Sequence, residues 1–167
     1  MALPDGTRTD PVSCPGCGLV GGSIEGPTHR YMLSSPRCWA LHGELLATGP
    51  TTQLAVDAYA AQHPGNPERR AIQSVGLHLV SLCAAFERDW RQEHAIGLIR
   101  RAAESGVRWQ WLDPNPPVGS ITVADVVAED EWPARQAAVR IWAEDVWATY
   151  SEHHSLIRVW LDSVLGE

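Results

Sequence analysis

The sequence contains no lysine, a single phenylalanine and no long apolar run. All 13 basic residues are arginine, they are scattered along the chain, and the formal net charge is −7. Nucleic-acid binding needs a concentrated positive surface, so we expect no nucleic-acid partner. No stretch approaches the roughly 18 apolar residues that can span a bilayer. Residues 1–11 are largely polar, unlike a signal peptide or an anchor, so we expect a cytoplasmic protein without membrane contact.

What is present suits one ordinary folding unit. The 167 residues are 44% hydrophobic and include eight tryptophans, which is enough for a core of normal size. Residues 1–35 are rich in Gly, Pro, Ser and Thr without helical periodicity, so we expect an irregular N-terminal segment. Residues 36–167 are expected to form a helical bundle with which this segment folds. The predicted fold class is therefore mainly α.

Apolar periodicity and capping residues predict helices in six segments. These are residues 36–47, 53–62, 68–88 and 93–104, a short helix after Thr122, and residues 133–165. The last is the longest, because apolar residues recur at spacings of three and four from Val139 to Val164. Such a seam is also compatible with a homodimer. Residues 109–119 contain three prolines and are expected to form a loop, with at most one strand, at residues 108–112.

The most specific signal is Cys14-Pro-Gly-Cys17-Gly. Two cysteines separated by two residues, with glycines that permit a tight turn, form the knuckle that grips one side of a tetrahedral zinc ion. Four cysteines in a reducing compartment favour metal ligation over disulfides. Cys38, in the first turn of the first helix, supplies a third thiolate that the helix dipole stabilises. The fourth ligand is either His29 in the preceding loop or His42, one turn after Cys38.

Two other interpretations of the Cys-x-x-Cys pair stay open. The cysteines could be free thiols in a mobile tail, although this sequence is an unusual choice for an inert segment. A redox pair would need a strand–helix context, which is missing here. A closed four-ligand zinc site is usually structural, and it would tie the glycine-rich segment onto the first helix. We therefore expect a zinc knuckle within the irregular N-terminal segment.

Several motifs together resemble a family of small bacterial proteins of unknown function that is common in actinobacteria. They are CPGCG at 14–18, PTHRY at 27–31, SPRCW at 35–39, VDAYAAQHP at 56–64, TVAD at 122–125 and HHSLIRVW at 153–160. The resemblance covers nearly the whole chain and implies a compact, stand-alone unit. It also implies His29 as the fourth zinc ligand, which gives the set Cys14, Cys17, His29 and Cys38. It implies no activity.

A second group of polar residues lies on the predicted third helix and its neighbours. Arg70, Ser74, His78 and Ser81 recur at spacings of four, four and three, and so share one stripe of that helix. Residues of other helices can complete a cleft there. The candidates for such a cleft are Asp57, His63, Arg70, His78, His153 and Arg158.

This candidate cleft has three interpretations: structural polar residues, a site for a non-metal ligand, or a second metal centre with three ligands and an open position. In a catalytic cleft, a histidine would act as general base or metal ligand. Arg70 or Arg158 would then hold an anionic group of the substrate.

Two functions therefore compete. The first is a zinc-binding helical enzyme, metal-dependent or histidine-based, that acts on a small molecule. The second is a zinc-stabilised protein-interaction module without catalysis. An enzyme should have a pocket where His78 and His153 converge, whereas an adaptor should expose apolar side chains near the zinc.

Trp109 and Trp111, on one side of the proline-rich loop, either cover a ligand or pack on the end of the bundle.

Overall fold

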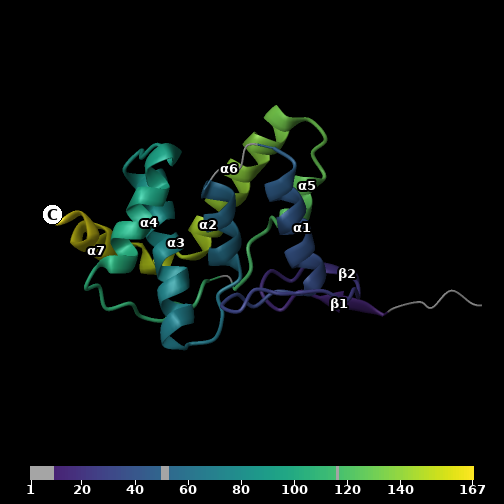
Figure 1. Cartoon of the computed structure of the whole chain (residues 1–167), viewed down its shortest axis with the longest axis horizontal. Coiled ribbons are helices and arrows are strands. Elements are labelled where there is room, and N and C mark those ends of the chain that lie inside the picture. The colour runs from purple at the N-terminus through teal and green to yellow at the C-terminus, as the bar shows by residue number, and fades with distance from the viewer. Residues whose placement is uncertain (1–9, 50–52, 116) are drawn as a thin grey trace, which may run out of the picture.

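The computed structural model describes residues 10–49, 53–115 and 117–167. Within these ranges the chain forms a small antiparallel hairpin followed by a bundle of helices (Figure 1). The elements are β1 (Pro11–Ser13), β2 (Val20–Gly22), α1 (Pro36–Ala47), α2 (Gln53–Gln62), α3 (Arg69–Glu87), η1 (Gln92–His94), α4 (Ala95–Glu104), α5 (Val123–Val127), α6 (Trp132–Thr149), η2 (Ser151–His153) and α7 (His154–Leu165). The predicted mainly α class is confirmed. None of the described helices is long and apolar enough to cross a membrane.

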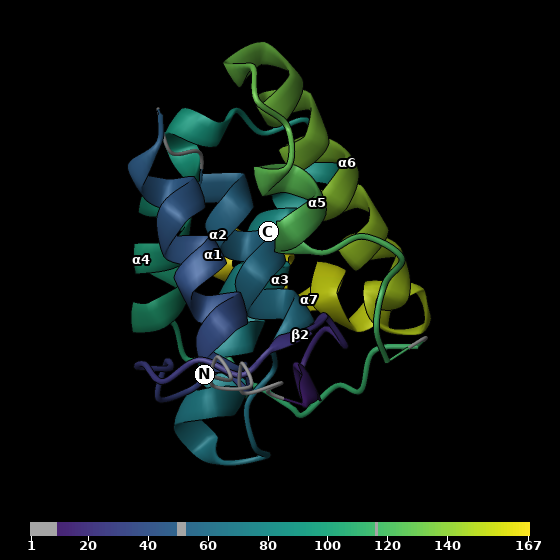
Figure 2. The same cartoon turned by 90° about the vertical axis from the view of Figure 1, so that its right-hand side faces the viewer.

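Helix α2 lies in the middle of the bundle and packs against α3 and α6 (Figures 1 and 2). Eight of its ten residues are buried, so it is covered on all sides and has no polar face. In the buried side chain of Gln62, both the amide nitrogen and the amide oxygen form hydrogen bonds. The nitrogen donates to the carbonyl of Ile121 at 2.7 Å, and the oxygen accepts from the indole N–H of Trp142 at 3.0 Å. Gln62 therefore links α2 to α6 and to the segment that leads into α5.

Helices α1 and α2 have the predicted bounds, but the prediction of one helix over residues 133–165 is wrong. The chain forms α6 and α7, separated by the 3₁₀ turn η2. The backbone N–H of Asn115 donates to the carbonyl of Thr149 at 2.6 Å, whereas the N–H of His153, the partner of that carbonyl in a continuous α-helix, bonds Tyr150. The loop before α5 therefore ends α6, because Asn115 occupies the carbonyl that would continue the helix. The apolar spacing continues across the break between α6 and α7, so the sequence pattern did not indicate where α6 ends.

The sequence did not predict the hairpin, and residues 108–112 form no strand. Each strand has three residues, with Val12 opposite Gly21 in the antiparallel register. Strands this short carry no alternating pattern that could be recognised. The hairpin packs on the first turn of α1, where Arg37 lies so close to Gly21 that an added Cβ would meet its Nε at 2.5 Å.

Gly76 in α3 lies directly beneath the indole ring of Trp109, and a Cβ there would stand 2.4 Å from the ring. We expect Gly76→Ala to displace the ring and to lower the free energy of unfolding by about 1–3 kcal/mol. Gly97 in α4 has nothing within 4 Å of its Cβ position. Gly97→Ala should therefore raise the free energy of unfolding by about 0.5–1 kcal/mol, because alanine is the better helix former. Urea unfolding measures both changes, and changes of the same sign would contradict this packing.

Candidate metal centre

Four buried side chains from three separate segments meet beside the hairpin. Cys14 and Cys17 come from the hairpin loop, Cys38 from the first turn of α1, and His63 directly follows α2. Their ligand atoms all lie within 4.8 Å of one another, and none of the four residues is more than 4% exposed. In the described part of the chain, this Cys3His group is the only set of three or more His, Cys, Asp or Glu residues that could share one metal ion.

The distances from the Cys38 sulfur to Cys17 and to His63 fit a tetrahedral zinc ion. Zinc bonds of about 2.3 Å to sulfur and about 2.0–2.1 Å to nitrogen place two sulfurs roughly 3.8 Å apart, and sulfur and nitrogen roughly 3.5 Å apart. The Sγ atoms of Cys17 and Cys38 are 3.7 Å apart, and Cys38 Sγ lies 3.3 Å from His63 Nε2. A disulfide would bring two sulfurs to about 2.05 Å. The cysteines are instead free thiols arranged around a common centre.

Backbone hydrogen bonds build the knuckle in the hairpin loop. The N–H of Cys14 donates to the carbonyl of Leu19 at 2.8 Å, and the N–H of Gly18 donates to the carbonyl of Cys14 at 2.9 Å. Gly18 has a φ of +74°, in the left-handed region that favours glycine. Gly16 lies against the imidazole of His63, where a Cβ would meet a ring carbon at 2.5 Å. One glycine therefore permits the turn, and the other permits the approach of the histidine.

Ser35 joins the knuckle to α1. It is the N-cap of the helix, and its Oγ accepts a hydrogen bond from the N–H of Cys38 at 3.2 Å. Its own N–H donates to the sulfur of Cys14 at 3.3 Å. Both the amide donor beside Cys14 and the helix N-terminus beside Cys38 favour a negatively charged sulfur, which is the form that binds metals.

The end of α2 orients His63. Its Nδ1 lies 2.7 Å from the carbonyl oxygen of Tyr59. Because a carbonyl only accepts, Nδ1 carries the proton, and the neutral ring presents an unprotonated Nε2 to the thiols. The ring of Tyr59 stacks between those of His63 and His42, with 4.0 Å between centroids on each side. The backbone carbonyl of His63 also accepts from the N–H of Leu33 at 3.2 Å, which fixes the segment before α1.

Without a metal ion, hydrogen bonds among the three thiols shift their pKa values in opposite directions. A hydrogen bond from Cys17 holds the pKa of Cys14 far below its usual range, and the same bond raises the pKa of Cys17 to about 11. Hydrogen bonding to Cys14 likewise raises the pKa of Cys38 well above its ordinary value. Mutual hydrogen bonding and burial therefore oppose charge on more than one of the three sulfurs. A bound dication would favour the loss of the remaining thiol protons, because metals bind the thiolate form.

The histidine that the structure brings to the thiols is His63, instead of His29 or His42. The Nδ1 of His29 accepts from the backbone N–H of Tyr31 at 3.1 Å, and its ring lies 5.3 Å from that of Trp39. His42 lies one turn beyond Cys38 in α1 but is not among the clustered ligand atoms. Burial lowers the pKa of His42 to about 4, so it is a neutral ring within the core.

One signal in the sequence did point to His63. The helices at 36–47 and 53–62 are similar in length and are joined by only five residues. Two helices with so short a connection usually run antiparallel, so the end of the second lies beside the start of the first. The side-chain contacts follow this order, since Cys38 meets His63 and, one turn along, His42 meets Tyr59.

The structure separates most of the six residues predicted for a second cleft. His63 belongs to the Cys3His group. Arg70 is exposed near the start of α3, where its guanidinium lies 3.4 Å from the hydroxyl of Tyr31. His153 lies at the end of η2, with its Nε2 2.8 Å from the carbonyl of Asp113.

Arg158, in α7, forms a bidentate ion pair with Glu87 at the end of α3, with 3.0 Å between Nη2 and Oε1. This pair holds α7 against α3. His78 and His153 have separate partners, and within the described residues Arg158 pairs with Glu87 and contacts neither histidine.

Asp57 and His78 are the two residues of this group that contact each other. The Asp57 carboxylate is fully buried and accepts hydrogen bonds from His78 Nδ1 at 2.7 Å, Ser81 Oγ at 2.6 Å and Gln53 Nε2 at 2.9 Å. Three donors offset the cost of burying a carboxylate. The pair therefore joins α2 to α3.

We expect His78→Ala to lower the free energy of unfolding by about 1–3 kcal/mol, because the buried carboxylate of Asp57 loses one of its donors. His78→Asn keeps an amide donor near the position of Nδ1 and should lose less. Urea unfolding near neutral pH compares the two variants. An alanine variant as stable as the native protein would instead favour a functional role for His78.

Gly16→Ala should weaken metal binding, because a Cβ would meet His63 and also the carbonyl oxygen of Leu33, at 2.4 Å. Gly26→Ala is the matched control in the same segment, since its nearest neighbour, Pro36, would be at an ordinary 3.8 Å. Competition with a coloured zinc chelator measures both affinities. We expect a loss of at least about tenfold for Gly16→Ala. A similar loss in both variants would show that His63 tolerates a side chain at position 16.

The whole Cys3His group lies within the range that a protein-family model matches. No curated protein and no solved structure matches the chain. The family model covers residues 12–151 and describes a family of unknown function. The membership that the sequence motifs implied is thereby confirmed. The chain belongs to the family of unknown function DUF5946.

Proposed function

We propose that this is a zinc-binding helical protein in which the Cys3His group holds one structural zinc ion. The observation that carries the proposal is the burial of four ligand atoms that all lie within 4.8 Å of one another. Three thiolates and a neutral imidazole are a donor set that suits zinc. Catalytic zinc keeps a position for water or substrate, whereas here four protein ligands complete the tetrahedron. The geometry therefore supports a structural role over that of a metal-dependent enzyme.

The zinc ion would join segments that otherwise have few connections. A two-stranded hairpin with strands of three residues is too short to be stable alone. Helix α1 makes its main helix–helix contacts with α5, away from the bundle centre formed by α2, α3 and α6. Zinc would fix the hairpin and the start of α1 to the end of α2. The separate partners of His78 and His153 likewise favour a binding protein over a histidine-based enzyme.

Elemental analysis of the purified protein should find one zinc ion per chain. His63→Ala should weaken zinc binding by more than about 100-fold, because losing a ligand exceeds the usual effect of losing a residue that only supports one. His29→Ala should retain the native affinity. A loss of zinc from the His29 variant alone would contradict the proposed ligand set.

Removal of zinc should loosen the hairpin while most of the helical circular-dichroism signal remains, since the core of α2, α3 and α6 lies outside the site. The measurement is hydrogen exchange at residues 13–22 with and without a chelator. A complete loss of the helical signal would show that the whole fold needs the metal.

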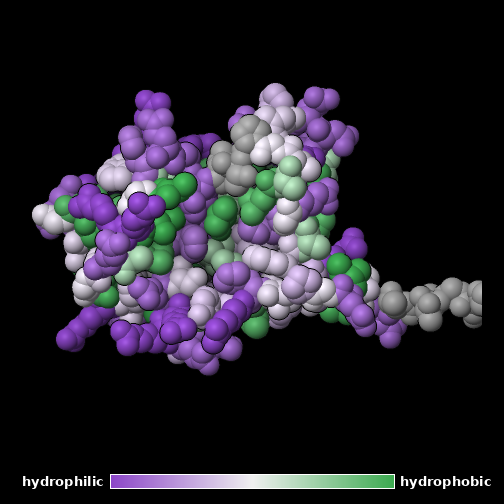
Figure 3. Space-filling view, in the orientation of Figure 1, coloured by the Kyte–Doolittle hydropathy of each residue, from purple (hydrophilic) through white to green (hydrophobic). Residues whose placement is uncertain are grey.

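A protein-interaction module is the second candidate function, because exposed apolar side chains gather on the zinc-bound segment. Four of the eight large apolar side chains exposed in the described residues lie between positions 12 and 33, namely Val12, Val20, Ile24 and Leu33. Hydrophobic surface is visible around the hairpin in Figure 3. Exposed apolar residues in one place are typical of surfaces that bind other proteins.

A photo-crosslinking residue placed at Val20 or at Val159 tests this candidate, because the two side chains are 64% and 61% exposed but Val159 lies in α7. In cells that make this protein, the residue at position 20 should give a discrete adduct whose partner binds the purified protein again. An equal yield from both positions would indicate non-specific contact.

A further inference from the structure

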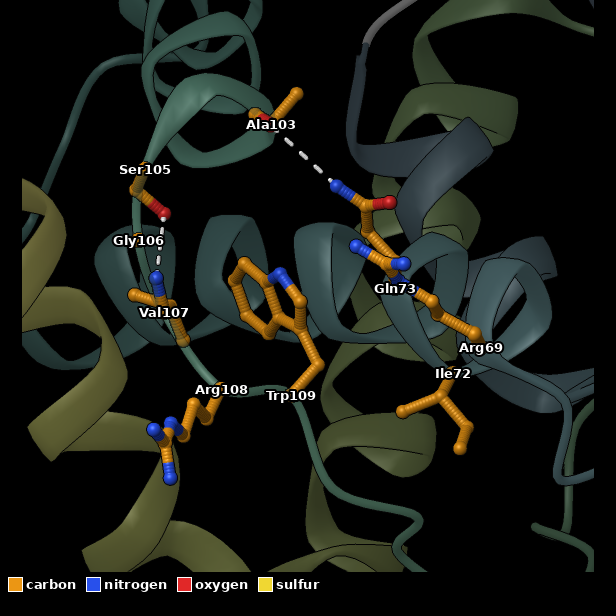
Figure 4. Close-up of a pocket in the computed structure, with 9 residues that line it drawn as sticks. All are labelled: Arg69, Ile72, Gln73, Ala103, Ser105, Gly106, Val107, Arg108 and Trp109. Carbon is orange, nitrogen blue, oxygen red and sulfur yellow. Dashed lines mark hydrogen bonds between the residues drawn. The ribbon is translucent and has the colours of Figure 1, made fainter.

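A cavity of about 640 Å³ lies between the start of α3, the end of α4 and the segment 105–109 (Figure 4). Its volume falls within the range of roughly 300–1,000 Å³ that small-molecule sites occupy. The cavity contains no residue of the Cys3His group, so it is a separate feature. The residues that line it are Arg69, Ile72, Gln73, Ala103, Ser105, Gly106, Val107, Arg108 and Trp109.

The indole ring of Trp109 forms a fixed wall of this cavity. The ring lies on α3, where Gly76 has no side chain to keep it away, and its edge meets Trp160 with 5.2 Å between centroids. Figure 4 shows the ring between the segment Ser105–Val107 on one side and Gln73 on the other. Packing on two helices holds the ring in place, so its free surface can receive an apolar or aromatic group without rearrangement.

The charge of the cavity is opposite to that of the protein. The chain has a formal net charge of −7, yet the lining contains two arginines and no aspartate or glutamate. Elsewhere Arg88, Arg91 and Arg158 pair with carboxylates. Within the described residues, neither Arg69 nor Arg108 has an acidic partner, so a ligand carboxylate or phosphate would meet an uncompensated guanidinium.

The polar groups in the cavity are mainly hydrogen-bond donors. Arg69 extends from α3 alongside Gln73 toward Trp109, whereas Arg108 points away from it (Figure 4). Within the described residues, neither the guanidinium of Arg69 nor the indole N–H of Trp109 has a hydrogen-bond partner. The side-chain nitrogen of Gln73 makes only a long bond, 3.4 Å, to the carbonyl of Ala103. Such donors beside an aromatic wall match an oxyanion attached to an apolar body.

We propose that this cavity binds a small organic anion, with its carboxylate or phosphate held by Arg69 and its apolar or aromatic body against Trp109. The inference goes beyond the zinc site and does not depend on it. Arg108, at the rim, adds attraction over a longer range.

Phenyl phosphate is a suitable probe, because it combines an aromatic ring with a phosphate. Titration into the zinc-loaded protein, followed by ¹H–¹⁵N NMR, should give saturable shifts of the Trp109 indole N–H and of the amides of residues 105–107. The dissociation constant should be on the order of millimolar, as expected for so small a ligand. Inorganic phosphate lacks the ring and benzylamine has the opposite charge, so both should bind at least about tenfold more weakly.

Arg69→Gln should weaken phenyl phosphate binding by about tenfold or more, because it removes the charged donor. Arg100→Gln is the matched control, since this exposed arginine of α4 does not line the cavity and its loss changes the net charge equally. Equal effects of the two variants would overturn the proposal, as would equal binding of phenyl phosphate and inorganic phosphate. No saturation at roughly ten times the expected dissociation constant would also overturn it.

Discussion

The convergence of three sulfur atoms and one imidazole nitrogen is the constraint on which the N-terminal third of the structure depends. The ligands come from a hairpin loop, the first turn of α1 and the residue after α2. Each position has its own local cause: a left-handed glycine in the loop, a serine cap on the helix, and a carbonyl that fixes the imidazole tautomer. These local features place four polarizable groups together at a cost that a bound cation would offset.

The aromatic stack of His42, Tyr59 and His63 connects this centre with the core. Tyr59 belongs to α2, which is buried on all sides and contacts both α3 and α6. Further along the same helix, Asp57 is paired with α3, and Gln62 with α6. The central helix therefore carries both the polar links of the bundle and, at its end, one residue of the Cys3His group.

Local signals in the sequence predicted the local parts of this structure. The bounds of α1 and α2 follow from capping and turn residues, the pairing of Cys14 and Cys17 from the knuckle spacing, and the role of Cys38 from its place in the first turn of a helix. The position of His63 depends on how two helices pack. Its separation of 25 residues from Cys38 does not by itself predict that the two residues meet. The break between α6 and α7 depends on a hydrogen bond from Asn115, more than 30 residues away. Periodicity describes which face is buried and not which distant group ends a helix.

The near-complete burial of the three cysteines, at 0–4% exposure, has a consequence for their chemical reactivity. Alkylating or oxidising reagents attack the thiolate and must first reach the sulfur atom. In this structure the hairpin loop covers its own cysteines, so access requires the hairpin to detach from α1 and α2. The rate of modification then reports local opening of the N-terminal segment as well as the intrinsic nucleophilicity of the sulfur atoms.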